Sequence, residues 1–518
     1  MFLKQEKEKE WIAILDFGSQ YTQLIARRVR EAKVYSEILP YNIDLKKIQQ
    51  DLPKGIILSG GPASVYEDQS LVCNKKIFEL GIPILGICYG AQLIAQFSGG
   101  KVVKASQAEY GRVDIIFDNQ EDIFHGFPAN STCWMSHQDL IESLPPNFKV
   151  IAQSENTKVA AMVNREKKFY GVQFHPEVSH TLLGKKLLEN FLYKICQCQY
   201  SWNLQSFIQQ SVKDIKEKVG EGKVVAGVSG GIDSIVAAAL THKAIGNQLY
   251  CIFINNGLLR KGEAEEVQKR FKNNFKIDLI YIDASERFLK KLKGISDPEI
   301  KRKIVGEEFI RIFEEKAKDI GRVNYLLQGT LYPDVIESIS LEGPSSTIKS
   351  HHNVGGLPEE MKLQVLEPLK YLFKDEVRKI AKKLKFPDEV IWRQPFPGPG
   401  LSIRVIGPID EKKLDILREA DDIIKQEIKR NALYKKVWQS FGILLPIKTV
   451  GVMGDIRTYD FVLALRIVNS SDGMTADWSK IPYAVLGKIS NRIINEVEGI
   501  NRIVYDISSK PPATIEWE

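Results

Sequence analysis

The sequence predicts an α/β protein with two successive doubly wound parallel-sheet domains, followed by a small α+β domain. Short apolar runs alternate with helical patterns over residues 11–195 and again over 224–328, as in chains built from βαβ units. A stretch dense in proline and glycine, residues 395–400, then interrupts the chain. A chain of 518 residues is long enough for several domains, which we place at 1–198, 199–397 and 398–518.

The strands expected in the first domain are apolar runs that end in polar or glycine-rich turns. They cover residues 11–15, 55–58 and 82–87. Buried runs separated by helices are typical of a parallel sheet covered on both faces. Because functional groups gather at the carboxyl ends of such strands, we expect a site where these three runs end.

The second and third domains are expected to differ in architecture. A helical linker at 200–220 leads into a second parallel sheet, with strands at 224–228, 249–254, 279–282 and 325–328. The last domain combines a long charged helix near 410–430 with strands near 449–453, 460–468 and 502–507. That mixture is the pattern of a small α+β module.

Composition argues against a nucleic-acid-binding protein and against a disulfide-rich one. The net charge of +7, from 72 basic and 65 acidic residues, is too small to indicate a nucleic-acid-binding protein. A small phosphate-bearing substrate needs only a local basic site. The six cysteines are too sparse for a disulfide framework, and the Cys196–Cys198 pair has no second Cys/His pair at zinc-like spacing.

The chain shows no targeting or membrane segment. Residues 1–10 are charged and contain no apolar core of a signal peptide. No apolar run approaches the roughly 20 residues that a transmembrane helix needs. We therefore expect a cytoplasmic protein without membrane association.

Cys88 lies in a sharp turn, Gly86-Ile87-Cys88-Tyr89-Gly90, between an apolar strand and a helix. Such a turn exposes a side chain and places its sulfur near a helix N-terminus, which favours a thiolate nucleophile. The Tyr89 N–H could stabilise an oxyanion, and Gly60 and Gly61 at the end of the neighbouring strand could supply a second donor.

A suitable base follows another apolar strand. His175 lies in Gly-Val-Gln-Phe-His-Pro-Glu, and Glu177 is close enough to orient its imidazole. A buried structural cysteine and a capping histidine would be the simpler explanation of either residue alone. Their joint placement at strand ends, with an acid following the histidine, favours a Cys88–His175–Glu177 triad.

These motifs, Gly-Ile-Cys-Tyr-Gly-Ala-Gln with His-Pro-Glu, resemble those of class I glutamine amidotransferases over residues 11–195. The resemblance implies that Cys88 attacks the glutamine side-chain amide while His175 transfers the proton. A thioester forms, water releases glutamate, and the product passed on is ammonia. It also implies that Gln92 contacts the bound glutamine.

A second reactive turn follows the strand at 224–228. It is not a Walker A loop, because no Gly-Lys-Ser/Thr follows, but backbone N–H groups and a helix N-terminus there suit phosphate. It resembles the loop of ATP pyrophosphatases, although a glycine turn used only for packing is the alternative. The expected ATP-binding residues are Ser229, Gly230, Gly231, Ile232, Asp233 and Ser234, with Asp233 as a Mg²⁺ ligand.

The remaining motifs extend the resemblance to the whole chain. Together with the two turns, residues 348–358, 373–378, 395–400 and 510–518 resemble the glutamine-hydrolysing GMP synthetase family. This implies that ATP adenylates O2 of xanthosine monophosphate (XMP) and that ammonia then displaces AMP. The implied substrate-binding residues are Arg302, Lys349, His351, His352, Lys510 and Glu516. A homodimer formed through the C-terminal domain is also implied.

One residue departs from the pattern of this family, and two other functions remain as alternatives. Asn255 occupies a position where that family usually has aspartate, so we leave it out of the site. One alternative is another amidating ligase of the same build, acting on a carboxylate. The other is a non-catalytic nucleotide sensor, which would not release glutamate from glutamine.

Overall fold

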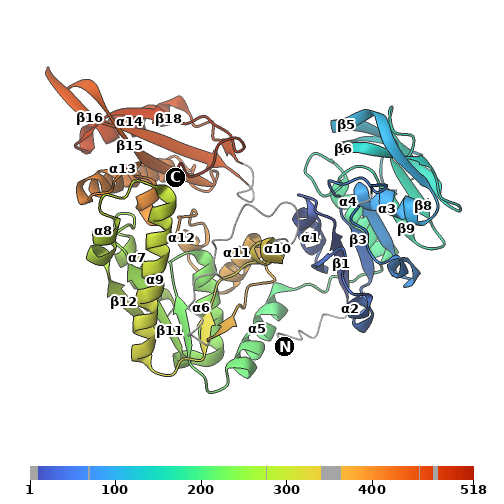
Figure 1. The fold of residues 1–518 in the computed structure, drawn as a ribbon, viewed down its shortest axis with the longest axis horizontal. Helices are drawn as coiled ribbons and strands as arrows, with labels where there is room; N and C mark the ends of the chain where they lie inside the picture. Colours follow the sequence, from blue (N-terminus) through green and yellow to red (C-terminus); the bar gives the residue numbers. More distant parts are fainter. Residues whose placement is uncertain are drawn as a thin grey trace. The chain divides into compact units, whose positions relative to one another are not determined.

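The computed structural model describes residues 10–67, 70–118, 120–275, 277–339, 363–453, 455–470 and 476–518. The chain forms two compact units, Met1–Ser206 and Phe207–Glu518 (Figure 1). The division into three domains at 198/199 and 397/398 remains a prediction. In the described ranges, no helix is both long and apolar enough to cross a membrane.

The first unit is built on a nine-stranded sheet in the order β2-β1-β3-β4-β9-β8-β7-β5-β6. Its parallel half consists of β2 (Tyr35–Pro40), β1 (Trp11–Asp16), β3 (Gly55–Leu58), β4 (Ile84–Ile87) and β9 (Phe169–Val172). Helices α1 (Thr22–Glu31) and α3 (Tyr89–Phe97) pack against these strands (Figure 1), and α2 (Leu45–Gln50) and α4 (Gly184–Asn190) complete the unit. The three predicted strands all form.

The other half of this sheet is antiparallel and was not predicted. It consists of β8 (Ala161–Asn164), β7 (Lys149–Gln153), β5 (Lys101–Phe117) and β6 (Asn130–Ser143). In β6, buried residues alternate with partly or fully exposed ones. A strand with one face toward solvent has no continuous apolar run, which is why sequence reasoning missed it. The sheet is therefore mixed within the predicted α/β class.

The second unit opens with the predicted parallel sheet, in the order β12-β11-β10-β13-β14. Its strands are β10 (Val224–Gly227), β11 (Leu249–Asn255), β12 (Leu279–Asp283), β13 (Tyr325–Leu327) and the unpredicted β14 (Gln364–Leu366). The helices are α5 (Leu204–Val219), α6 (Ile232–Ile245), α7 (Glu263–Arg270), α8 (Ser285–Leu292), α9 (Pro298–Ile320), α10 (Tyr332–Ile339), α11 (Lys374–Lys383) and α12 (Asp388–Ile391).

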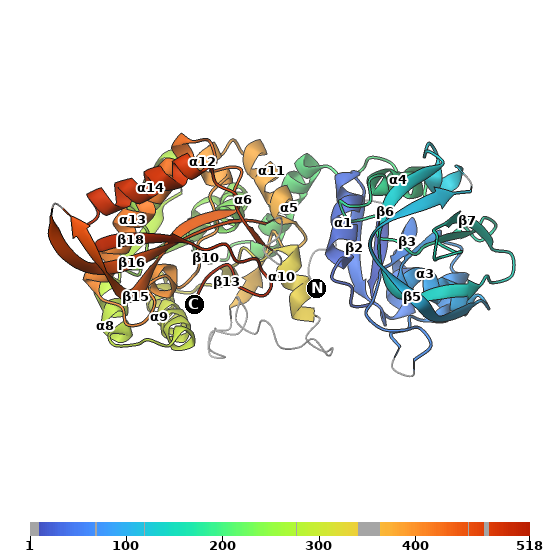
Figure 2. The ribbon, with the colours of Figure 1, turned by 90° about the horizontal axis from the view of Figure 1, so that it is seen from above.

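The Pro/Gly-rich stretch forms turns that lead into a short 3₁₀ helix, η7 (Gly400–Ile403). A second sheet then contains β15 (Gln439–Met453), β16 (Ile456–Asn469), β17 (Asp477–Trp478) and β18 (Ile500–Tyr505). Helices α13 (Glu411–Arg430) and α14 (Tyr483–Glu496) lie side by side against it (Figure 2).

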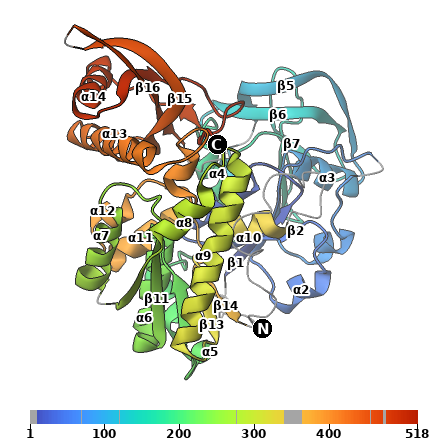
Figure 3. The ribbon, with the colours of Figure 1, turned by 60° about the vertical axis from the view of Figure 1, so that its left-hand side comes forward.

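One apolar core joins the two sheets of the second unit. It runs from Val225 and Ile252 beneath the first sheet to Leu463 and Ile489 beneath the second. Because these side chains are removed from water together, the two parts pack as one body. The end of the β15–β16 ribbon projects away from that body (Figure 3).

Candidate active sites

Cys88 occupies a strained turn between β4 and α3. Its φ of 52° and ψ of −108° lie in a region that non-glycine residues seldom adopt. Neighbouring glycines make the turn possible, since a Cβ on Gly86 would lie 2.4 Å from the carbonyl oxygen of Gly90. A Cβ on Gly90 would lie 2.4 Å from the carbonyl oxygen of Leu58. The backbone N–H of Cys88 donates to Val172 on β9, which ties the turn to the strand that precedes His175.

His175 and Glu177 follow β9, the strand next to β4. The Nδ1 atom of His175 lies 2.8 Å from Oε1 of Glu177, whose side chain is fully buried. Two further contacts hold the histidine backbone: Thr181 Oγ1 donates to its carbonyl at 2.6 Å, and its N–H donates to Trp134 at 2.9 Å. Because Nδ1 is engaged by Glu177, Nε2 is the ring nitrogen that can exchange a proton with Cys88.

The electrostatics of this group favour the imidazolium form of His175. Burial of His175 disfavours the imidazolium, but the Glu177 carboxylate and the Cys88 side chain outweigh burial and raise the pKa of His175 well above its ordinary value. An imidazolium beside the sulfur stabilises negative charge on it. The arrangement fits the predicted triad, in which an acid orients a histidine base beside a cysteine nucleophile, and the catalytic roles of the three residues stay a prediction.

The proposed oxyanion donors surround this pair. A Cβ on Gly60, just after β3, would lie 3.2 Å from Cε1 of His175. A Cβ on Gly61 would lie 2.7 Å from the carbonyl oxygen of Phe17, so both positions demand close backbone approach. Tyr89 begins α3, and its hydroxyl donates to Leu71. The role of these groups as oxyanion donors stays a prediction.

Gln92 is buried and connects to the sulfur through another amide. Its Nε2 donates to the carbonyl of Asp139 at 2.9 Å and to Oε1 of Gln173 at 3.3 Å. Gln173 Nε2 in turn lies 3.6 Å from the sulfur of Cys88. Sequence reasoning missed Asp139, a nearly buried carboxylate that accepts from Ser64 and Tyr66. It lies on β6, a strand that was not predicted, so no sequence signal pointed to it.

The second turn, Ser229–Ser234, connects β10 to α6. Gly230 has a φ of +72°, and Gly231 is the N-cap of α6, so the loop turns sharply into the helix N-terminus. The N–H of Gly231 lies 3.3 Å from Ser229 Oγ, and the Ser234 hydroxyl donates to the Gly231 carbonyl at 3.0 Å. Ile232 is buried at the first position of the helix. This geometry suits phosphate oxygens.

Asp233 has one oxygen engaged and one unsatisfied. Its Oδ2 lies 3.3 Å from the Lys374 ammonium at the start of α11. Its Oδ1 is buried and has no hydrogen-bond partner among the residues that the structure describes. An unsatisfied carboxylate oxygen beside a phosphate loop fits Mg²⁺, which takes one or two protein carboxylates together with substrate phosphates. Within the described ranges, no larger cluster of metal-binding side chains occurs.

Two of the predicted XMP-binding residues, Arg302 and Glu516, belong to the contacts of the segment 516–518. Glu516 accepts two hydrogen bonds from Arg404, at 3.0 and 2.8 Å, and one from Gln439 at 2.9 Å. Arg302 donates to the backbone carbonyl of Glu518. Lys510 exchanges backbone hydrogen bonds with Ala476. Lys349, His351 and His352 lie outside the described residues.

Sequence reasoning missed the buried cations that hold this segment. Lys301 is fully buried, and its ammonium donates to the carbonyls of Ser402 and Val405 and to the Glu518 carboxylate at 2.5 Å. Arg404 is also fully buried. Because a buried cation requires paired charges and hydrogen bonds, these contacts attach residues 516–518 firmly to α9 and η7.

Comparison with known proteins matches three regions of the chain to protein families. The model of the class-I glutamine amidotransferases matches residues 13–195, that of NAD synthase matches 202–305, and that of the GMP synthase C-terminal domain matches 426–517. A glutamine-hydrolysing GMP synthase from Brachyspira hyodysenteriae is 59% identical over 507 residues, which cover 98% of this chain and 99% of the relative. One from Acetivibrio thermocellus is 58% identical over 510 residues, with 98% and 99% covered.

The chain belongs to the glutamine-hydrolysing GMP synthases. It is accordingly an ATP-using carbon–nitrogen ligase that makes GMP with nitrogen from glutamine. This membership excludes the two alternatives, a ligase for a carboxylate substrate and a non-catalytic sensor. The resemblance seen in the sequence motifs is confirmed over nearly the whole chain.

Asn255, the position at which this chain departs from the usual GMP synthase pattern, ends β11. Its Oδ1 accepts from the N–H of Gly257 at 3.1 Å, and its amide donates to the Tyr281 hydroxyl at 3.2 Å. An aspartate could accept from the Gly257 N–H in the same way but has no amide to donate. Asn255 thus retains the turn-forming contact.

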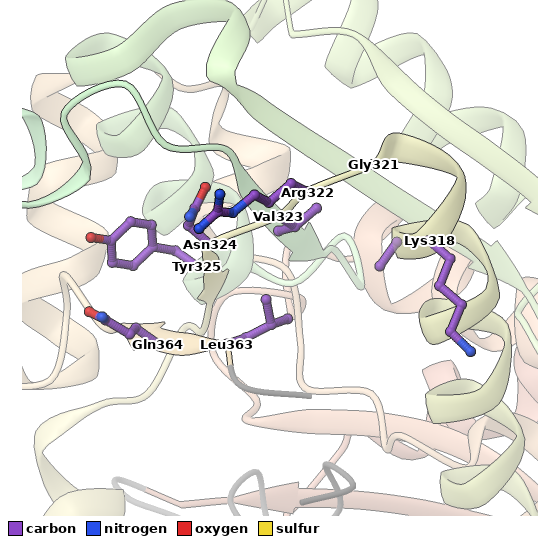
Figure 4. A pocket seen from close by; sticks show the side chains of 9 residues that line it. Lys318, Gly321, Arg322, Val323, Asn324, Tyr325, Leu363 and Gln364 are labelled. Carbon is purple, nitrogen blue, oxygen red and sulfur yellow. The ribbon is translucent and has the colours of Figure 1, made fainter. Parts of the chain in front are cut away.

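One pocket lies away from the GMP synthase phosphate loop. It is lined by residues that precede or begin β13 and β14, including Arg322, Asn324, Tyr325 and Gln364 (Figure 4). The loop follows the carboxyl end of β10, which is parallel to β13. The pocket therefore lies at the opposite edge of the sheet from the loop, and we assign it no part in the reaction.

Proposed function

We propose that Cys88, His175 and Glu177 hydrolyse glutamine, and that the Ser229–Ser234 loop binds the ATP that activates XMP for amination. The observation that supports the first half is the His175–Glu177 contact of 2.8 Å beside the strained Cys88 turn. The unsatisfied Asp233 oxygen at a helix N-terminus supports the second half.

In the glutaminase reaction, the Cys88 thiolate attacks the side-chain amide carbon of glutamine. The backbone N–H groups of Tyr89 and of Gly60 or Gly61 hold the resulting oxyanion. The His175 imidazolium gives its proton to the departing nitrogen, which leaves as ammonia, and a thioester remains. His175 then takes a proton from the water that attacks the thioester, so glutamate and the free thiolate are released.

Glu177 acts through the histidine. Its carboxylate fixes the ring orientation and stabilises the imidazolium that each half of the reaction requires. Gln92, bonded to the Asp139 carbonyl and to Gln173, is expected to orient the bound glutamine beside the sulfur.

In the synthetase reaction, O2 of XMP attacks the α-phosphorus of ATP and pyrophosphate leaves. Ammonia then attacks C2 of the adenylated base, AMP leaves, and GMP is formed. The loop N–H groups and the hydroxyls of Ser229 and Ser234 bind the phosphates, and Lys374 adds a positive charge beside Asp233. A Mg²⁺ ion held by Asp233 would neutralise charge on the pyrophosphate leaving group.

We propose that XMP is bound by Arg302, Lys510 and Glu516, together with Lys349, His351 and His352. A carboxylate oxygen can accept two hydrogen bonds; Oε1 of Glu516 accepts from Arg404 and Gln439, whereas Oε2 accepts from Arg404 Nε and keeps capacity for a substrate donor. Arg302 and Lys510 supply positive charge for the nucleotide phosphate.

We further propose a cytoplasmic homodimer that forms through the C-terminal domain. The exposed apolar side chains of the β15–β16 ribbon support this. Their exposed fractions are 57% for Ile447, 74% for Val452, 70% for Ile456 and 64% for Tyr459. Large apolar side chains exposed together on one element are typical of an interaction surface. Sedimentation should give twice the chain mass, and Val452→Lys with Ile456→Lys should give monomers.

The deciding experiment measures GMP formation from XMP and ATP, with glutamine or ammonium as nitrogen source. Cys88→Ala should abolish the glutamine-driven reaction and leave the ammonium-driven one intact. Loss of both activities in a folded Cys88→Ala protein would contradict the proposed division of labour.

A further inference from the structure

Arg393 contacts the phosphate loop from behind. It lies between α12 and the Pro/Gly-rich stretch, and its Nη1 donates to the carbonyl oxygen of Gly230 at 2.6 Å. Only 15% of the side chain is exposed. The two residues are 163 positions apart in the chain, so this contact is a product of tertiary packing.

The contact determines which way a loop peptide points. In a trans peptide the C=O of Gly230 and the N–H of Gly231 face opposite sides. Arg393 holds the carbonyl at the rear of the loop, so the Gly231 N–H faces Ser229 Oγ, 3.3 Å away, at the phosphate side. A Cβ on Gly230 would lie 2.5 Å from Arg393 Nη1, and the φ of +72° at this position already favours glycine.

Arg393 is itself held in place by charge. Its Nη2 pairs with the Glu263 carboxylate, which is 7% exposed and also accepts from the N–H of Arg260 at 3.0 Å. Burial, assisted by the nearby Arg260 cation, lowers the pKa of Arg393 to about 10. The guanidinium therefore remains charged at neutral pH, and its two arms bind the loop and α7 at once.

The segment that carries Arg393 also contacts the Glu516 cluster. Gln439 Nε2 donates to the carbonyl of Pro395 at 3.2 Å and to Oε1 of Glu516 at 2.9 Å. One residue, Gln394, thus separates the attachment to the phosphate loop at Arg393 from the attachment to the Glu516 cluster at Pro395. Residues 393–395 therefore contact both the phosphate loop and the Glu516 cluster.

We propose that Arg393 is a positioning residue for ATP: it orients the Gly230–Gly231 peptide so that the loop presents its N–H groups to the phosphates. This rests on the proposed function, namely that the Ser229–Ser234 loop binds ATP. The residue acts through the backbone of the loop and does not itself contact substrate.

The test uses ammonium-driven GMP synthesis by the full chain, with KM measured separately for ATP and XMP. Arg393→Gln should raise the KM for ATP by about tenfold to a hundredfold, the effect of losing one charged hydrogen bond. The KM for XMP and the glutaminase activity should stay near wild type. Arg393→Lys keeps the positive charge but has one ammonium nitrogen in place of two guanidinium arms, so it should recover part of the loss.

Arg270→Gln is the matched control. Arg270 lines the same cavity behind the loop as Arg393, but its contact is with Glu266 on its own helix, at 2.8 Å. This variant should bind ATP normally. A similar rise in KM for ATP in Arg270→Gln would overturn the inference, because general loss of positive charge would then explain the effect.

Other outcomes separate the inference from the function on which it rests. If Asp233→Asn leaves the KM for ATP unchanged, the loop is not the ATP site and the proposed function fails. If Asp233→Asn impairs ATP use but Arg393→Gln does not, the inference alone fails. Should Arg393→Gln not fold, Arg393→Lys decides: wild-type KM for ATP overturns the proposal, and a raised KM for ATP with normal XMP binding supports it.

Discussion

The ammonium of Lys374 lies 3.3 Å from Oδ2 of Asp233, which places a cation from α11 beside the phosphate loop. The loop itself contains no lysine. The two partners are 141 positions apart, and the chain between them includes β13 and β14. Because β13 pairs in parallel with β10, and β14 with β13, the start of α11 reaches the loop. A charge that a Walker A loop carries within its own sequence is thus supplied by a distant helix.

Lys374→Gln should therefore lower pyrophosphate release in the presence of ATP and XMP. We expect a fall of at least about tenfold, because one preorganised charge near a developing negative charge is lost. Glutaminase activity should persist. Lys379→Gln is the control, since Lys379 pairs with Asp375 on the outer face of the same helix, and equal losses in both variants would argue against a local role.

Glu177→Gln tests whether Glu177 controls the pKa of His175. Because Glu177 is the main group that raises the pKa of His175, the variant should lower that pKa. The His175 imidazolium exists only below the pKa of His175, so the alkaline limb of glutamine kcat/KM should shift to lower pH. The rate itself should fall by about a hundredfold or more. An unshifted pH profile would mean that Glu177 does not govern the titration.

Gly90→Ala tests the cysteine turn. The added Cβ would lie 2.4 Å from a backbone oxygen of Leu58, which cannot move without disturbing β3. We expect a loss of about 1–3 kcal/mol in stability and little remaining glutaminase activity. Gly306→Ala, in α9 with open space around the new methyl group, should be neutral or slightly stabilising in thermal unfolding.

Lys301→Met tests the attachment of the Glu518 segment. The change leaves the Glu518 carboxylate without its buried cation and should destabilise the second unit by about 3–5 kcal/mol. Lys301→Met combined with Glu518→Gln should recover part of this loss in thermal unfolding and in ammonium-driven synthesis. No recovery would mean that the ion pair is not the source of the effect.

Coupling between the sites can be measured directly. Hydrolysis of glutamine without GMP synthesis would waste glutamine. We therefore expect ATP and XMP together to raise the rate of glutamine hydrolysis at the Cys88 site. Glutamate release should be compared with and without both nucleotides. Equal rates would show that the Cys88 site works independently of the second unit.

The sequence determined the parts whose cause is local. Runs such as 55–58 and 224–228 are apolar enough to be buried on both faces, so their strands and the turns after them were predictable. Cys88, His175 and the Ser229–Ser234 loop were found because each follows such a strand. The β5–β6 ribbon was missed, because a half-exposed strand mixes polar and apolar residues in a pattern that loops share.

Tertiary structure alone decided which distant side chains meet. The partners Lys374 for Asp233, Arg393 for Gly230 and Arg404 for Glu516 come from separate helices and loops. In the sequence, Lys374, Arg393 and Arg404 look like any other charged residues. Many other lysines and arginines of this chain could make the same ion pairs and hydrogen bonds. The choice is made by packing, because a buried charge is stable only where strand order and helix position bring a partner within hydrogen-bond distance.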